Sequence, residues 1–240
     1  MPLEERNAPI FDLIPFVHLF DWTIAVDRYI ATGDASMVKE LTDLEIKKIN
    51  NEINKNIKGK NVNRNILFKD PNSIRNLANS MSTFSDAVST CRGPELTNII
   101  SQLKQNIDNV LESTAHERIK PLTPIIQILK ERFNRFSLND DYINMIETAK
   151  WCYDNEMYQQ GFTILQEGLI SYVCEKWHLD KFNKGSRSQV INYSYMIKDG
   201  TVNPDYKSIE MTQENANQLF ILIYEMVNVR NDINHAGWRE

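Results

Sequence analysis

The sequence predicts an all-α fold, a helical bundle with an additional helical subdomain. Apolar residues recur at steps of three and four through most of the chain, which is the period of a helix with one buried face. Alternating β-branched residues are rare, and glycine and proline number only eight each. The 240 residues, 42% of them hydrophobic, suffice for one sizeable core, or for a core with an appended helical unit.

The N-terminal part predicts one strand-like run followed by two helices. Residues 8–13 are a short apolar run bounded by prolines, and are too isolated to make a sheet by themselves. The spacing over 16–30 predicts an amphipathic helix, which Gly33 ends while Asp34 caps the next helix. The residues that mark the first helix are Phe16, Leu19, Phe20, Ile24 and Asp27.

The middle of the chain predicts a soft boundary and then four helices. Residues 45–66 are rich in Asn and Lys and poor in large apolar groups, which favours a solvated helix end and a mobile loop. Residues 96–111 repeat apolar side chains at helical period. A helix is also expected over 121–136, because its two prolines lie where a first helical turn tolerates them. Further helices are expected at about 139–156 and 157–178.

Residues 181–187 form the most basic patch near the end of the chain. Three cations, Lys181, Lys184 and Arg187, surround one glycine in this segment. We expect an exposed loop here.

The last helix is expected to begin after Thr212, its N-cap, and to end before Gly237. Its narrow apolar stripe consists of Ala216, Phe220, Ile223 and Val227. Continuing the stripe at helical period places Arg230 and Asn234 within it, with Asn231 and His235 on one flank. Burying such polar groups on a core face costs roughly several kcal/mol of folding free energy unless they are paired or lie at a wet interface. A symmetric dimer or an active site satisfies this requirement, and fraying of the helix end into solvent is the alternative.

Composition excludes several classes of function. The net charge is -5, so any nucleic-acid site must be local. The three cysteines lack the spacing of a zinc site or a redox dithiol, which suits a reducing cytoplasm, and neither an export signal nor a membrane span is expected. No metal or cofactor pattern is present, and His18, His116 and His178 are expected to be structural.

The tail VRNDINHAGWRE resembles the signature of the HEPN superfamily, in which Arg is followed by Asn, Asp or His and, a few residues later, by His. Together with residues 151–177 it looks like the C-terminal half of ancillary ribonucleases of type III CRISPR systems, which join a CARF sensor to a HEPN nuclease. Residues 8–42 are similar to the segment where the CARF domain ends, whereas 43–150 match only loosely, as a helical insert.

The resemblance implies a division of the chain into three parts. Residues 1–14 are expected to be a residual linker or last strand of a missing CARF domain, residues 15–137 a helical subdomain, and residues 138–240 a HEPN-type ribonuclease bundle. Two departures from the family pattern accompany this expectation. Cyclic oligoadenylate would bind only through a CARF domain absent from this chain. Family members usually continue with at least one more helix after the motif, whereas this sequence stops at Glu240.

The resemblance further implies metal-independent cleavage of single-stranded RNA, without a cofactor, by a homodimer. Arg230, His235 and Asn231 are the expected catalytic residues, and Asn234 is expected to position the substrate. In the basic patch Lys181, Lys184 and Arg187 are expected to steer the RNA backbone, although an ordinary solvated loop has the same composition. Two alternatives stay open: a HEPN-like dimerisation or partner-binding module without activity, and the toxin of a toxin–antitoxin pair.

Overall fold

The computed structural model describes residues 13–57, 69–112 and 123–235, and within them the all-α prediction is confirmed. These residues contain no strand. They form α1 (Ile14–Thr32), α2 (Ser36–Ile57), α4 (Lys69–Ser89), the short 3-10 helix η1 (Gly93–Glu95), α5 (Leu96–Glu112), α6 (Thr123–Phe133), α7 (Asp141–Asp154), α8 (Tyr158–Lys176), α9 (Lys184–Lys198) and α10 (Gln213–Asn234). The predicted strand-like run lies outside the described residues, except for Leu13, which is not in a strand.

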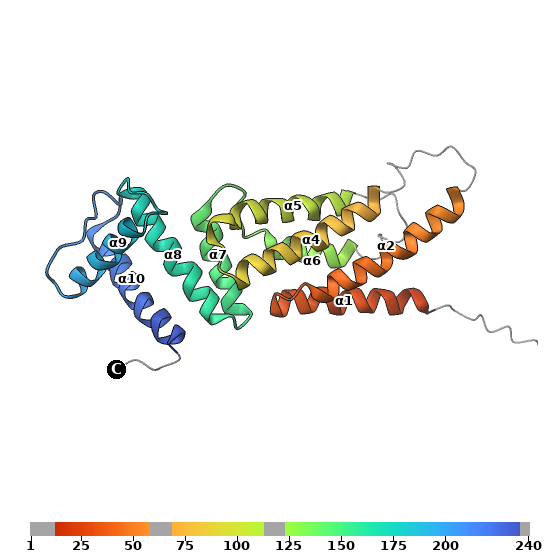
Figure 1. Ribbon diagram of the computed structural model, residues 1–240, viewed down its shortest axis with the longest axis horizontal. Coiled ribbons are helices and arrows are strands. Elements are labelled where there is room, and N and C mark those ends of the chain that lie inside the picture. Colours follow the sequence, from red (N-terminus) through yellow and green to blue (C-terminus); the bar gives the residue numbers. More distant parts are fainter. Residues whose placement is uncertain (1–12, 58–68, 113–122, 236–240) are drawn as a thin grey trace, which may run out of the picture.

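The helices form an elongated molecule, with α1, α2, α4, α5 and α6 at one end and α9 and α10 at the other (Figure 1). Buried hydrophobic side chains form two clusters. One extends from Trp22 to Ile164, and the other from Ile170 to Val227. Helix α8 contributes to both, because Ile164 belongs to the first cluster and Ile170 to the second. The clusters therefore meet within α8, which joins the two ends of the molecule.

Aromatic rings fill the centre of the first cluster. Trp151 of α7 lies 5.5 Å from Phe84 of α4 and 5.4 Å from Phe133 of α6, measured between ring centroids. Tyr29 of α1 lies 5.7 Å from the same indole. Burial raises the pKa of the Tyr29 phenol, since its hydroxyl is shielded from water. One tryptophan thus connects four helices.

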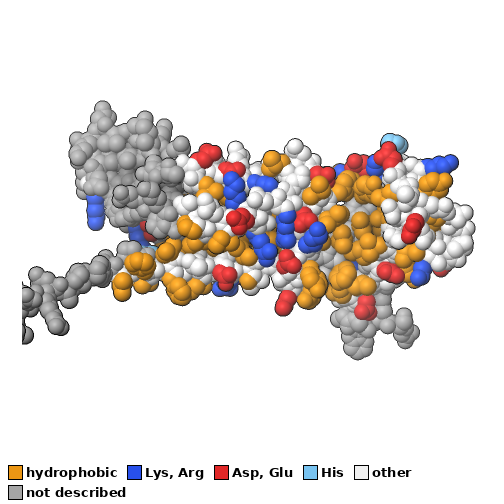
Figure 2. Space-filling model, turned by 180° about the vertical axis from the view of Figure 1, so that it is seen from behind, with side chains coloured by type: hydrophobic (Ala, Val, Ile, Leu, Met, Phe, Trp, Pro, Cys, Tyr) orange, Lys and Arg blue, Asp and Glu red, His pale blue; other side chains and the backbone are white. Residues whose placement is uncertain are grey.

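Helix α1 is present as predicted, but the apolar face that marks it in the sequence is not its buried face. Phe16 and Phe20 are 68% and 64% exposed, whereas Ala25 and Tyr29 are fully buried. Hydrophobic side chains gather over α1 along the lower edge of the molecule in Figure 2. The helix is apolar on more than one side, so periodicity alone could not choose which side packs.

Gly33 and Asp34 connect α1 to α2 as the sequence predicts. Gly33 has a φ of 70°, the left-handed conformation that ends a helix and that glycine adopts without strain. Asp34 accepts a hydrogen bond from the backbone N–H of Ser36 at 2.8 Å. That bond and the neighbouring Arg28 hold the pKa of the Asp34 carboxyl below its usual value, with the hydrogen bonds as the larger cause.

Asn144 ties α7 to the loop before it and to α5. Its side chain accepts from the backbone N–H of Ser137 at 2.8 Å, and donates to the Ser137 carbonyl and to Thr97 Oγ1 at 3.0 Å each. Because Asn144 is fully buried, Asn144→Ala would leave several of these polar groups unpaired. We expect a loss of about 1–3 kcal/mol in the free energy of unfolding, measured by urea denaturation.

Asn139→Ala is the matched control, because Asn139 is an exposed asparagine of the same loop. Its expected effect is below about 0.5 kcal/mol. Equal stability of the two variants would show that the buried amide contributes nothing.

Candidate functional site

Arg230 lies near the C-terminal end of α10, where this helix runs antiparallel to α8. The direction follows from two contacts: Gln159 Nε2, near the start of α8, donates to Asn234 Oδ1 at 3.0 Å, and Phe220 stacks on Trp177, just after the end of α8. The Arg230 side chain is 31% exposed, and its Nη1 lies 3.6 Å from Glu167 Oε1. Its Nε is buried and has no hydrogen-bond partner within the part of the chain that the structure describes.

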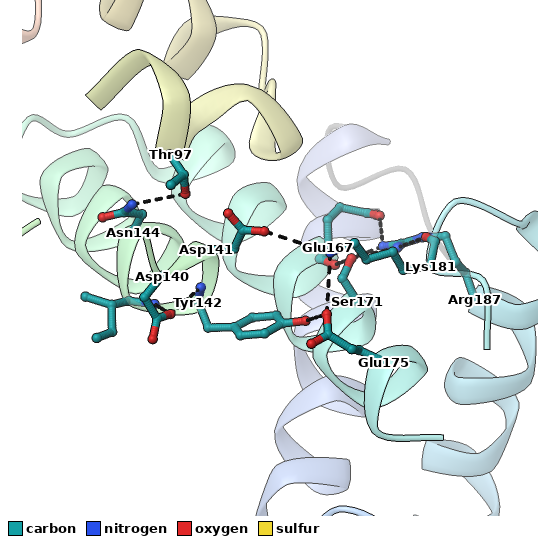
Figure 3. A network of polar contacts seen from close by, with 11 residues as sticks. Thr97, Asp140, Asp141, Tyr142, Asn144, Glu167, Ser171, Glu175, Lys181 and Arg187 are labelled. Atoms are coloured by element: carbon teal, nitrogen blue, oxygen red, sulfur yellow. Dashed lines mark hydrogen bonds and ion pairs between the residues drawn. The ribbon is translucent and has the colours of Figure 1, made fainter. Parts of the chain in front are cut away.

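Glu167 of α8 also pairs with Arg187 (Figure 3). Arg187 Nη2 donates to a Glu167 carboxylate oxygen and, at 2.9 Å, to the Glu167 carbonyl. Arg187 Nη1 donates to Ser171 Oγ and to the Lys181 carbonyl at 2.8 Å each. One carboxylate therefore lies between the two arginines that sequence reasoning assigned to separate roles.

The expected exposed loop at 181–187 is wrong from Lys184 onward, because α9 begins there. Asn183 is the N-cap, and its side chain accepts from the backbone N–H groups of Gly185 at 2.8 Å and Ser186 at 3.2 Å. Arg187 then lies in the first turn with its side chain only 19% exposed. Its four hydrogen bonds make it a tie between α8 and α9 rather than a cation available to the RNA backbone.

The other two cations of this patch differ from each other. Lys184 is exposed in the first turn of α9. Lys181 Nζ lies 3.4 Å from Glu175 and 3.8 Å from Asp141. Of the three predicted steering residues, Lys184 is thus the one whose exposure suits contact with a polyanion.

The polar end of α10 is presented to solvent beyond Arg230. Asn231 is half-buried, and Asn234 and His235 are exposed. His235 is the C-cap residue, and its backbone N–H donates to the Asn231 carbonyl at 3.0 Å. The stripe Ala216, Phe220, Ile223 and Val227 is buried as predicted, so the polar residues do continue a core face up to the point where it reaches the surface.

Beside Glu167 lies a cavity of about 330 Å³ between α7, α8, η1 and the segment before α9. Its lining is Cys91, Gly93, Pro94, Asp141, Tyr142, Met145, Ile164, Glu167, Gly168, Ser171, Lys181, Phe182 and Arg187. The lining combines apolar walls with polar groups, a mixture typical of small-molecule sites.

Two titratable groups at this cavity have shifted pKa values. Burial, and then the hydrogen bond that it donates to Glu175 at 2.7 Å, raises the pKa of the Tyr142 phenol. The same hydrogen bond lowers the pKa of the Glu175 carboxyl. Burial raises the pKa of the Cys91 thiol, against smaller opposing effects of a hydrogen bond with Thr163 and of Arg230. Cys91 is therefore a protonated wall residue near neutral pH rather than a nucleophile.

Glu167 is the residue that sequence reasoning missed. An arginine on a core stripe requires an acidic partner, and this requirement was visible in the sequence. The chain offers 32 acidic residues, and only the antiparallel packing of α8 on α10 selects this one.

The described ranges 13–57, 69–112 and 123–235 bring together no group of three His, Cys, Asp or Glu side chains that could hold a metal ion. Within the same ranges no helix has both the length and the apolar character that a membrane crossing requires.

Comparison with known proteins finds sequence similarity to a CRISPR-associated protein. It is 21% identical over 236 residues to the CRISPR-associated protein MJ1674 of Methanocaldococcus jannaschii. No family model matches the chain, and no solved structure matches it significantly. The alignment covers 97% of this chain but only 30% of the relative. The chain is therefore similar, over nearly its whole length, to part of a CRISPR-associated protein.

Proposed function

We propose that the chain is a HEPN-type, metal-independent endoribonuclease that cleaves single-stranded RNA as the effector part of a CRISPR-associated antiviral protein. The observation that carries the proposal is Arg230. Its guanidinium lies at the surface end of a core stripe, five residues before an exposed histidine, and its buried Nε–H finds no acceptor among the residues that the structure describes. A buried donor without a partner costs about 1–3 kcal/mol, so this side chain is held in place at a cost to stability. Because the side chain is 31% exposed, the rest of its guanidinium can donate to a phosphate oxygen.

The proposed reaction needs one base and one acid. The ribose 2′-OH loses its proton to the base, its oxygen attacks the adjacent phosphorus, and the bond to the 5′-oxygen breaks as the acid protonates that oxygen. The products are a 2′,3′-cyclic phosphate and a 5′-OH. Imidazole suits both proton transfers near neutral pH, and the Arg230 guanidinium stabilises the negative charge that develops on the phosphate. Asn231, half-buried beside Arg230, is proposed to orient the phosphate or His235.

A second copy of the chain is proposed to supply the second histidine. The motif provides one imidazole per chain, and His235 is exposed at a helix end where a two-fold partner can approach. Two copies related by such an axis would place two His235 side chains and two Arg230 side chains around one phosphodiester.

The test is a gel assay of end-labelled single-stranded RNA in EDTA. We expect the wild-type protein to cut, to leave a 2′,3′-cyclic phosphate, and to elute as a dimer, whereas an Arg230→Ala/His235→Ala double variant should not cut. Cleavage that requires an added divalent cation, or equal cleavage by the double variant, would contradict the proposal.

The ion pair between Arg230 and Glu167 favours a second candidate, a HEPN-like dimerisation module without cleavage. In this arrangement the guanidinium neutralises a protein carboxylate instead of a phosphate. The same assay separates the candidates, because a dimer that never cuts RNA assigns the second function.

A further inference from the structure

The cavity beside Glu167 has a composition that suits a flat, neutral, hydrogen-bonding ring. Met145 and Ile164 provide apolar walls, and Phe182 at the rim is 70% exposed. The backbone of Gly168 lies so close to Met145 that an added Cβ would be 1.4 Å from its sulfur atom. Glycine at this position thus lets α7 and α8 pack closely along one wall of the cavity.

The charged groups of the cavity favour a neutral occupant over a phosphate. Its two cations are both paired with carboxylates: Arg187 with Glu167, and Lys181 with Glu175 and Asp141. An anion would have to break these pairs, whereas a neutral ring would not. The Asp141 carboxylate lies 3.8 Å from Lys181 through Oδ2 only, and its side chain is 59% exposed, so it can still accept from an N–H donor.

The cavity lies next to the proposed cleavage site. The two oxygens of Glu167 face Arg230 on one side and Arg187, a lining residue, on the other. A phosphate bound by Arg230 would therefore be one carboxylate away from the cavity, which is the neighbourhood in which a flanking nucleotide places its base.

We propose that this cavity binds one base of the single-stranded RNA, stacked on Phe182, and that it favours bases with an exocyclic amine over uracil. Single-stranded RNA is commonly recognised by stacking of splayed bases on aromatic side chains and by hydrogen bonds to their Watson–Crick edges. Asp141 accepts from the amine of adenine, cytosine or guanine, as carboxylates do from cytosine N4. Uracil offers no such amine.

This inference rests on the proposed function, and its test does not require cleavage. Fluorescence anisotropy measures binding of labelled 2′-fluoro hexanucleotides of adenine or of uracil, in which the attacking hydroxyl is absent. We expect the wild-type protein to bind the adenine strand more tightly. Phe182→Ala should weaken binding of the adenine strand about 5- to 150-fold, the range that corresponds to loss of one stacked base. Asp141→Ala should reduce the preference for adenine over uracil.

Phe20→Ala is the matched control, since Phe20 on α1 is similarly exposed, at 64%, and lies away from the cavity lining. It should leave both affinities unchanged. Equal affinity of wild-type protein for the two strands, or no effect of Phe182→Ala, would overturn the base site even if the protein cuts RNA. Base-selective binding that Phe182→Ala abolishes, in a protein that never cuts RNA, would retain the base site and reject the nuclease.

Discussion

His235→Ala is expected to lower the rate of RNA cleavage by a factor of roughly 10²–10⁴, the usual contribution of a general acid or base. Among the described residues, the substitution removes the only imidazole at this helix end, which is the side chain proposed to transfer the proton. Stability should hardly change, because His235 is exposed at the C-cap and the hydrogen bond to the Asn231 carbonyl comes from its backbone N–H, which alanine retains. Cleavage rates under single-turnover conditions in EDTA, with circular dichroism to check folding, measure the effect.

His18→Ala is the control for loss of an exposed histidine, since His18 lies on α1 at the opposite end of the molecule. Its cleavage rate should equal that of the wild type. Mixing wild-type and His235→Ala chains tests the composite site. If both histidines act on one phosphate, activity should fall with the square of the wild-type fraction. A linear decline, or a rate unchanged by His235→Ala, would contradict the proposed mechanism.

Most helices were predictable because periodicity records burial directly. Residues 96–111 were expected to be a helix, and α5 spans Leu96–Glu112 with its apolar stripe buried. The stripe of α10 was likewise correct from Ala216 to Val227. In α1 the same argument selected a face that is exposed, since an apolar residue signals burial only when the opposite face is polar.

Two local signals compete at the start of α9. Gly185, which follows Asn183 closely, favours a loop because glycine interrupts helices. Asparagine is also a preferred N-cap, and here its side chain satisfies two backbone N–H groups of the first turn. The cap could have been predicted from the sequence.

The pairing of Arg187 with Glu167 could not have been predicted in this way. It depends on how α8 and α9 pack, and the periodicity of a helix shows which face is buried but not which helix covers it. The Arg230–His235 motif is local in sequence, whereas Glu167 and the cavity exist only after folding.

Trp151→Ala should cause the largest loss of stability, about 3–5 kcal/mol, as is usual when a large buried aromatic side chain is removed. Trp151 is only 1% exposed, and its ring contacts aromatic rings of α1, α4 and α6. Deleting it opens a cavity at the point where four helices meet. Whole domains are stable by only about 5–15 kcal/mol, so this loss is a large fraction of the total. Trp151→Phe is therefore the second variant, with a smaller expected loss in the same direction.

Urea denaturation followed by circular dichroism measures these losses, with Tyr153→Ala as the control on the same helix. Tyr153 is 71% exposed, and removing it should cost less than about 1 kcal/mol. The Tyr153→Ala variant should therefore be the most stable of the three, Trp151→Phe less stable, and Trp151→Ala the least stable. Helix α7 also carries Tyr142 and Met145, which line the cavity. If Trp151→Phe changes the packing of α7, binding of the adenine hexanucleotide should weaken as well. A Trp151→Ala protein as stable as the Tyr153→Ala control would mean that the aromatic cluster does not hold α7 in place.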